Sequence, residues 1–231
     1  MQIRILQLLE GASQASGVAV IIDVFRAFST ACFVVANGAR AIIPVADLAD
    51  AYRLKESHPD SILIGERDEK IQPGFDYGNS PTQIEKVNFA NRTVVQTTSA
   101  GTQGIANAGR ADQILTGSFV NAQAIVDYLR RSQPVEVSLV AMGTAGREVS
   151  DEDTLCAQYL KNKLEGKPTA FGDIVQKLRY CATAAKFFDP SKYWAPERDF
   201  DLCMQLDRFS FVLRAEPMER DGVALKKVSC S

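Results

Sequence analysis

The chain has 231 residues, a formal net charge of -2 at pH 7 and hydrophobic residues at 46% of its positions, which is the balance of a globular protein with a substantial core. Without a strong positive charge or a long run of lysine and arginine, there is no reason to expect a nucleic acid partner. The five cysteines are scattered and contain no Cys-x-x-Cys pair, so we expect reduced thiols rather than disulfides or a thiolate zinc site. No apolar run is long enough to cross a bilayer and no signal sequence is evident, so we expect a cytoplasmic protein without membrane contact.

Along the first 150 residues, short apolar segments alternate with segments of helical spacing. Strands are predicted at 18–22, 41–43, 62–64, 93–95 and 135–142. Helices are predicted at 27–37, 47–57, 99–108 and 118–131, where capping residues or glycines mark their ends. Strand and helix in alternation predict an α/β fold, with a largely parallel or mixed sheet between two helical layers in an α/β/α sandwich. A ligand site is then expected at the carboxyl ends of the strands.

From about residue 151 the pattern becomes more helical. Helices are predicted at 151–165, 172–188 and 198–207, and short strands near 209–214 and 222–228. No flexible linker marks a boundary between the two parts. We therefore expect one domain over residues 1–231, with a helical C-terminal subdomain from about residue 151 as the alternative.

The most informative segment follows the predicted strand 62–64. It contains Gly65-Glu66-Arg67 and then Gly74-Phe75-Asp76-Tyr77-Gly78-Asn79-Ser80-Pro81. Carboxylates, a guanidinium and an amide stand here among glycines, which let backbone N–H groups approach a ligand closely. This mixture favours a site for a metal and an anion, whereas a solvated loop of ordinary turn residues is the alternative.

Asp23 ends the predicted strand 18–22, and Arg26, Ser29 and Thr30 open the helix that follows. The first N–H groups of that helix and the Arg26 side chain would face the Asp23 carboxylate, which gives an anion pocket beside a metal ligand or a nucleophile. The alternative is an Asp23 that caps its own helix and pairs with Arg26.

Two more strand ends have a similar character. Thr97-Thr98-Ser99-Ala100-Gly101-Thr102 offers hydroxyls and a glycine that suit phosphate oxygens, or a helix cap. Gly143-Thr144-Ala145-Gly146 precedes Asp151-Glu152-Asp153, whose charges the helix dipole alone would also explain. We expect all four polar strand ends to converge on one edge of the sheet, and their joint occurrence favours a functional site.

Several familiar chemistries lack an essential residue. There is no Walker Gly-x-x-x-x-Gly-Lys-Ser/Thr loop, and no cysteine is followed by an arginine six positions on. The single histidine, His58, lies at a polar helix end and is expected on the surface, which removes Ser-His-Asp hydrolysis and histidine-bound zinc. Carboxylates without histidine or thiolate partners select a hard cation such as Mg²⁺, which commonly bridges carboxylates to a substrate phosphate.

Together these segments resemble the 2-phosphosulfolactate phosphatase family of Mg²⁺-dependent, ComB-like enzymes. The matching pieces are Asp23-Val24-Phe25-Arg26 with Ser29-Thr30, Gly65-Glu66-Arg67 with the segment from Gly74 to Pro81, Thr97-Thr98 with Gly101-Thr102, Gly143, Gly146, Glu152 and Asp153, and a later echo at Asp199-Phe200, Cys203 and Asp207. The sequence departs from the family pattern at Asp68-Glu69-Lys70, where glycines commonly stand, and at Ser99-Ala100. Both departures border the expected pocket and bear on which substrate it takes.

The resemblance implies an α/β fold, a Mg²⁺ cofactor and hydrolysis of (R)-2-phospho-3-sulfolactate to 3-sulfolactate and phosphate, a step toward coenzyme M. A phosphatase of the same mechanism for another phosphorylated hydroxy acid is one alternative. A catalytically silent protein that binds an acidic ligand is another. A homodimer is expected only because symmetric dimers are common.

The residues expected to carry this chemistry fall into three groups. The catalytic candidates are Asp23, Arg26, Glu66, Arg67 and Asp153. The metal candidates are Asp23, Glu66, Glu152 and Asp153. The substrate-binding candidates are Ser29, Thr30, Asp76, Gly78, Asn79, Ser80, Thr98, Gly101 and Thr102. The sequence leaves open whether Asp23 attacks phosphorus or only holds the metal.

Overall fold

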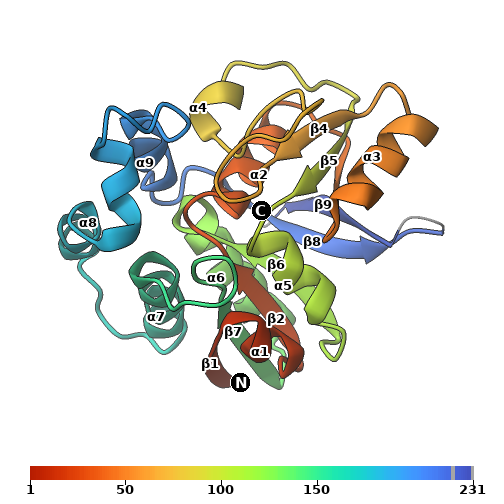
Figure 1. The fold of residues 1–231 in the computed structure, drawn as a ribbon. Coiled ribbons are helices and arrows are strands. Elements are labelled where there is room, and N and C mark those ends of the chain that lie inside the picture. The colour runs from red at the N-terminus through yellow and green to blue at the C-terminus, as the bar shows by residue number, and fades with distance from the viewer. Residues whose placement is uncertain (220–221, 230–231) are drawn as a thin grey trace.

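The computed structural model describes residues 1–219 and 222–229, and it has the predicted α/β architecture (Figure 1). The described strands are β1 (Gln2–Gln7), β2 (Val18–Ile22), β3 (Ala41–Pro44), β4 (Ile62–Gly65), β5 (Thr93–Thr97), β6 (Gln113–Gly117), β7 (Glu136–Ala141), β8 (Phe211–Pro217) and β9 (Val223–Ser229). The described helices are α1 (Leu8–Ser13), α2 (Ala27–Ala36), α3 (Leu48–Ser57), α4 (Pro81–Ile84), α5 (Gly101–Asn107), η1 (Phe119–Asn121), α6 (Ala122–Ser132), α7 (Asp151–Leu164), α8 (Phe171–Arg179), η2 (Ala182–Phe188) and α9 (Glu197–Cys203).

The mixed sheet has the strand order β1-β7-β2-β6-β8-β9-β3-β5-β4. Strands β1, β7, β2 and β6 form one parallel group, and β3, β5 and β4 form another. The β8–β9 hairpin lies between them and is antiparallel to both β6 and β3. The two parallel groups therefore run in opposite directions.

This topology corrects one expectation, because the four polar strand ends do not share one edge of a single parallel sheet. Strands β2 and β7 belong to one group, whereas β4 and β5 belong to the other. The groups are joined narrowly, since β8 pairs with β6 at two positions and β9 with β3 at one. The segments after β2 and β5 nevertheless meet: a Cβ added at Gly101 would lie 2.9 Å from Asp23 Oδ2.

Helices cover both faces of the β2 group. Successive residues of a strand point to opposite faces of the sheet, so β2 contributes side chains to a core on each face. Val20 and Ile22 pack into a core with residues of α6, α7 and α8. Ala19 and Ile21 pack into a second core with residues of α1, α2 and α5. A smaller core lies between α3 and the strands β3, β4 and β5, where Leu54 is buried. These cores make the three-layer arrangement that the alternating pattern predicts.

Most helices and strands lie where the sequence predicts them, and the differences have local causes. The region predicted as one helix at 172–188 is divided into α8 and the 3₁₀ segment η2. The helix predicted from residue 118 begins with the 3₁₀ turn η1, which the Ser118 hydroxyl caps. Strands β1 and β6 and helices α1 and α4 lie outside the sequence prediction. Strand β1 sits at the edge of the sheet and its residues remain partly exposed, so it lacks the apolar run of a buried strand.

The sequence predicts a single histidine on the surface and reduced thiols at the cysteines. His58 is exposed, as predicted. The thiols of Cys32, Cys156, Cys181 and Cys203 are free and buried, while Cys230 lies outside the described residues. No described helix combines the length and the apolar character that crossing a membrane requires.

Helix α5 packs closely on β2 at Gly104. A Cβ at this position would lie 2.5 Å from Met142 Sδ and 2.6 Å from Ile21 Cγ2, both of which are fully buried. We predict that Gly104→Ala destabilises the protein by about 1–3 kcal/mol, because overpacking outweighs the roughly 1 kcal/mol gain in helix propensity. Chemical denaturation measures the change. Gly109→Ala is the control, since nothing lies within 4 Å of a Cβ there; equal losses in both variants would contradict the packing explanation.

Candidate active site

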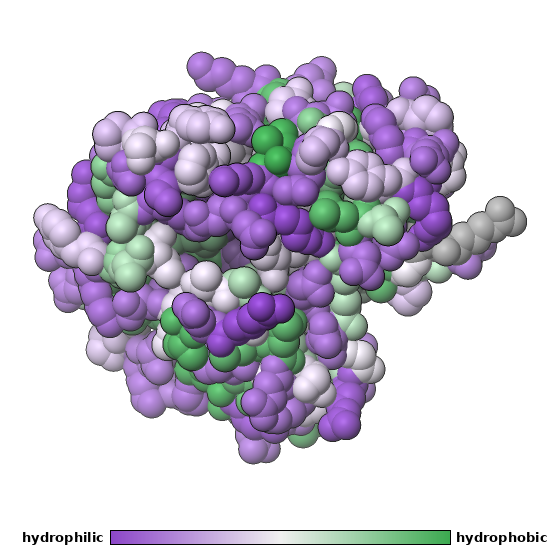
Figure 2. Space-filling model, in the orientation of Figure 1, coloured by the Kyte–Doolittle hydropathy of each residue, from purple (hydrophilic) through white to green (hydrophobic). Residues whose placement is uncertain are grey.

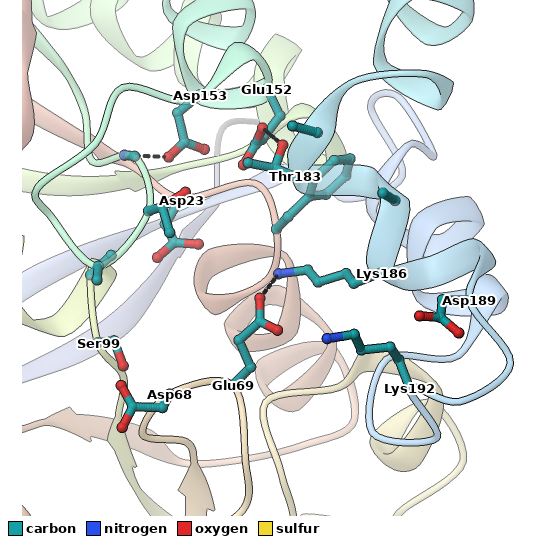
Figure 3. Close-up of a pocket in the computed structure, with 17 residues that line it drawn as sticks. Asp23, Asp68, Glu69, Ser99, Glu152, Asp153, Thr183, Lys186, Asp189 and Lys192 are labelled. Atoms are coloured by element: carbon teal, nitrogen blue, oxygen red, sulfur yellow. Dashed lines mark hydrogen bonds and ion pairs between the residues drawn. The ribbon is translucent and has the colours of Figure 1, made fainter.

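A cavity of about 620 Å³ lies where the segments after β2, β4, β5 and β7 meet the C-terminal helical part (Figure 3). In the space-filling view this face of the molecule is hollowed near its centre, with hydrophilic residues beside the hollow (Figure 2). The described residues that line the cavity are Asp23, Phe25, Asp68, Glu69, Ser99, Ala100, Gly143, Thr144, Ala145, Glu152, Asp153, Ala182, Thr183, Ala185, Lys186, Asp189 and Lys192. The lining thus holds six carboxylates and two lysines.

Asp23 is buried at the end of β2 and contributes to this lining. Its Oδ1 accepts a hydrogen bond from the Ala27 backbone N–H at 3.0 Å, so it also caps the start of α2. Burial raises the pKa of Asp23 to about 6, and the negative charges of Glu66 and Glu152 act in the same direction. The capping role and the functional role considered for Asp23 are therefore compatible.

Asp153 and Glu152 lie in the first turn of α7, and both are buried. Asp153 Oδ1 accepts a hydrogen bond from Val24 N and Oδ2 accepts one from Gly143 N, each at 2.8 Å. Asp153 thereby ties the segment after β2 to the segment after β7. Burial, followed by the charges of Glu152 and Asp23, raises the pKa of Asp153 well above its usual range.

Glu152 lies beside Thr183 of η2 at one end of the cavity (Figure 3). Its Oε2 accepts a hydrogen bond from the Thr183 hydroxyl at 2.5 Å. Burial raises the pKa of Glu152, although this hydrogen bond opposes the shift. Three buried carboxylates with raised pKa values therefore lie together at one end of the cavity.

Glu66 is buried directly after β4, beside the cavity but outside the residues that line it. Its Oε1 accepts a hydrogen bond from Ser99 N at 2.6 Å, and its Oε2 accepts from Glu69 N at 2.8 Å and from the Ser99 hydroxyl at 3.0 Å. Glu66 therefore holds the loop after β4 against the loop after β5.

The chemistry of this donor set fits a hard divalent cation, because every candidate ligand is a carboxylate oxygen. Burial raises the pKa values of all three carboxylates, and the negative charge of Glu152 raises those of Asp23 and Asp153 further, a repulsion that a cation would offset. In the described part of the chain, no group of three or more His, Cys, Asp and Glu side chains is already placed to hold a metal ion. Binding would therefore require these side chains to draw closer together.

Both predicted phosphate-binding arginines have partners within the protein. Arg26 forms a buried ion pair with Asp199 at 2.8 Å and donates to Trp194 O at 2.7 Å. Arg67 donates to Glu66 O at 2.8 Å, to the Thr97 hydroxyl at 2.6 Å and to Ala46 O. Neither arginine lines the cavity. The structure shows them joining chain segments around the site.

The nine predicted substrate-binding residues also lie outside the described cavity lining. Ser29 donates to Val24 O at 2.8 Å, and Thr98 and Thr102 exchange backbone-to-hydroxyl hydrogen bonds. Asp76 is exposed and accepts from Leu63 N at 2.8 Å. The remaining five are all buried: Thr30, Gly78, Asn79, Ser80 and Gly101.

Some of those five have clear structural functions. Ser80 donates to Asp199 at 2.7 Å, and Gly78 N donates to Gln83 Oε1 at 2.8 Å. Gly101 has no side chain where Asp23 and α2 approach α5. Much of the polar pattern read from the sequence thus builds the framework of the site.

The structure adds residues to the cavity that the sequence prediction did not name as ligands. Asp68 and Glu69 come from the loop after β4, at one of the two departures from the family pattern, and Thr183, Lys186, Asp189 and Lys192 come from the C-terminal part. Ser99 and Ala100, the other departure, also line the cavity. Both departures therefore face the space where a ligand would bind.

Asp68 and Glu69 adopt φ angles of 50° and 66°. This left-handed region is unfavourable for residues with a side chain and is easily occupied by glycine. The loop thus places two carboxylates in the cavity at a position whose backbone would suit glycine better.

The sequence profile of the family described as 2-phosphosulpholactate phosphatase matches residues 4–217. The chain belongs to this family. It is 37% identical over 159 residues to a "probable 2-phosphosulfolactate phosphatase" of Caldicellulosiruptor saccharolyticus. This match covers 67% of this chain and 66% of that protein. A protein of the same name from Thermotoga petrophila is 40% identical over 64% of this chain and 62% of its own length. The match to a Bacillus subtilis protein of that name is 27% identical over 88% and 87%. The first two matches thus span slightly less than two thirds of the relatives' lengths.

The buried pair between Arg26 and Asp199 predicts a large loss of stability in Asp199→Ala. Asp199 Oδ2 accepts from Arg26, and Oδ1 accepts from Ser80 and from Thr82 N. Removing the carboxylate leaves a buried guanidinium without its charge partner, and we predict a loss of about 3–5 kcal/mol in unfolding free energy. Glu197→Ala is the control on the same helix, because the pair of Glu197 with Arg179 is exposed and should be worth less than about 1 kcal/mol. Similar losses in the two variants would contradict this assignment.

Proposed function

We propose that this protein is a phosphoric monoester hydrolase that converts 2-phospho-3-sulfolactate to 3-sulfolactate and phosphate. Membership of the 2-phosphosulpholactate phosphatase family supports the reaction class. The observation that carries the proposal is the meeting of Asp23, Glu152 and Asp153, buried, in one cavity. Buried carboxylates with raised pKa values are typical of functional sites. Formation of 3-sulfolactate would place the reaction in coenzyme M synthesis.

We also propose that the reaction depends on Mg²⁺. Asp23 and Glu152 would hold the ion, with Asp153 alongside, and Glu66 would support the site through Ser99 and Glu69. The ion would supply positive charge that offsets the negative charge of the phosphate. Asp153 would keep the segments after β2 and β7 in register, because its two oxygens are bound by backbone N–H groups from both.

Asp23 has two chemically distinct roles open to it. As a nucleophile it would form a phosphorylated intermediate, whereas as a ligand it would leave attack on phosphorus to water. A pKa of about 6 keeps most Asp23 side chains ionised near neutral pH, which either role requires. Rapid quenching with ³²P-labelled substrate separates them, because only the first role leaves acid-stable label on the protein.

A different phosphorylated hydroxy acid is the second candidate substrate. The observation that favours it is the pair of carboxylates, Asp68 and Glu69, in the cavity lining. They would oppose a strongly anionic substrate more than a glycine loop would. A protein that binds the acid without turnover is the remaining alternative.

The direct test is phosphate release from 2-phospho-3-sulfolactate and from related phosphorylated acids, with Mg²⁺ and with chelator. We predict release that requires Mg²⁺ and falls by at least about a hundredfold in Asp23→Asn, because the carboxylate charge is lost. Preference for another acid would favour the second candidate. Binding without release from any substrate would favour the silent protein and contradict the enzymatic proposal.

Asp23→Asn should also stabilise the protein in chelator at pH 8. The folded state raises the Asp23 pKa to about 6, so folding favours the protonated form. The contribution of the protonated Asp23 side chain to the free energy of unfolding is fully present below the usual carboxyl pKa. It is lost as the pH rises through about 6. We predict that the variant is more stable than wild type by up to about 3 kcal/mol at pH 8. The difference should shrink toward zero near pH 4 in denaturant titrations; a difference independent of pH would contradict this cause.

A further inference from the structure

Positive charge in the described cavity lining comes from Lys186 and Lys192 alone. Arg26 and Arg67, which the sequence pattern offers as anion ligands, bind partners outside the cavity. A substrate with several acidic groups therefore meets these two lysines and, under the proposed function, a bound cation. Both lysines belong to the C-terminal part of the chain, opposite the loops after the strands (Figure 3).

Lys186 forms an ion pair with Glu69 across the cavity, with 2.6 Å between Nζ and Oε1. The Lys186 side chain is only 15% exposed, whereas that of Glu69 is 41% exposed. The pair joins η2 to the loop after β4, two segments 117 residues apart in sequence. A largely buried ammonium group is thus neutralised by a carboxylate that remains accessible to water.

Glu69 is held in this position through its backbone. Its N–H donates to Glu66 Oε2 at 2.8 Å, and its φ angle of 66° lies in the left-handed region. Such conformations persist where the surrounding structure imposes them, often at functional sites. The Glu69 carboxylate thus occupies one hydrogen-bonding position on the Lys186 ammonium group.

Lys192 lies beside this pair, and Figure 3 shows its side chain extending toward the same part of the cavity as Lys186. Its ammonium group lies 5.3 Å from the centroid of the Trp194 ring. Within residues 1–219 and 222–229, Lys192 has no carboxylate within ion-pair distance. The carboxylate of Asp189, which also lines the cavity, accepts hydrogen bonds from Ser191, so Lys192 stays available to an anion that displaces Glu69.

We propose that Lys186, assisted by Lys192, recognises the second acidic group of the substrate, and that Glu69 competes with this group for Lys186. This inference rests on the proposed phosphatase function and extends it to substrate selection. The recognised group is an anionic oxyacid, either the sulfonate or the carboxylate that accompanies the phosphate. Glu69 lowers affinity for such substrates, because they must displace it from the ammonium group.

The test measures KM and kcat with three phosphate esters: 2-phospho-3-sulfolactate, 2-phospholactate without the sulfonate, and isopropyl phosphate without either second acid. Lys186→Gln should raise KM for the recognised acid by roughly ten- to one-hundredfold relative to isopropyl phosphate. Glu69→Gln should lower KM for the same acid in the same comparison. Lys186→Arg, which keeps the charge, should recover part of the loss.

Lys167→Gln is the matched control. Lys167 forms an ion pair with Glu165 at the same 2.6 Å distance but lies outside the cavity. If the pair had only a structural role, Lys186→Gln and Glu69→Gln would change KM in the same direction, and by the same factor for all three esters. That result would overturn the proposal. If Lys186→Gln does not fold, Glu69→Gln and Lys192→Gln decide by their opposite effects on KM.

A failure of the proposed function can be distinguished from a failure of this inference. If wild type releases phosphate from none of the esters, calorimetric binding of 3-sulfolactate replaces the kinetic comparison. Binding that weakens at least tenfold in Lys186→Gln and strengthens in Glu69→Gln would support acid recognition without the phosphatase reaction. Undetectable binding to wild type, or equal binding to all variants, would overturn the inference.

Discussion

The arrangement of the site is governed by the burial of three carboxylates close together: Asp23, Glu152 and Asp153. Burial disfavours the ionised form of each carboxylate and raises all three pKa values, and neighbouring carboxylates add to the effect at Asp23 and Asp153. The described lining of the cavity contains no arginine, and Arg26 is paired with Asp199. Backbone N–H groups from segments after different strands bind the oxygens instead. The remaining excess charge is the physical reason for assigning a cation to this cavity.

Other polar contacts hold the fold together around the site. The two parallel strand groups share few residue pairs with the β8–β9 hairpin, so the sheet alone joins them weakly. Glu66 links the loops after β4 and β5 within one group. Asp199 on α9 connects the start of α2 with Ser80 before α4, and Glu69 contacts Lys186 in η2. Polar contacts between loops therefore set the shape of the cavity as much as the sheet does.

The sequence was most informative where local chemistry determines structure. β2 has the predicted bounds because its five residues are all buried, and Asp23 follows it into the cavity. The sequence could not show that Arg26 would find Asp199, 173 residues away, or that Lys186 would reach the loop after β4. Those contacts depend on tertiary packing, and Lys186 stands in a 3₁₀ segment where helical periodicity gives no signal. The resemblance supplied the reaction class, and its departures at Asp68-Glu69-Lys70 and Ser99-Ala100 marked part of the cavity lining that other patterns missed.

The proposed metal site requires Asp23 and Glu152, with Asp153 alongside, to draw together around a divalent cation. Anomalous diffraction from crystals of the active protein grown with Mn²⁺ and phosphate tests it most directly, because the signal locates the ion without assuming its ligands. We predict an ion bound to Asp23 and at least one of the other two carboxylates, at metal–oxygen distances of about 2.1 Å. An ion bound elsewhere, away from all three side chains, would contradict it.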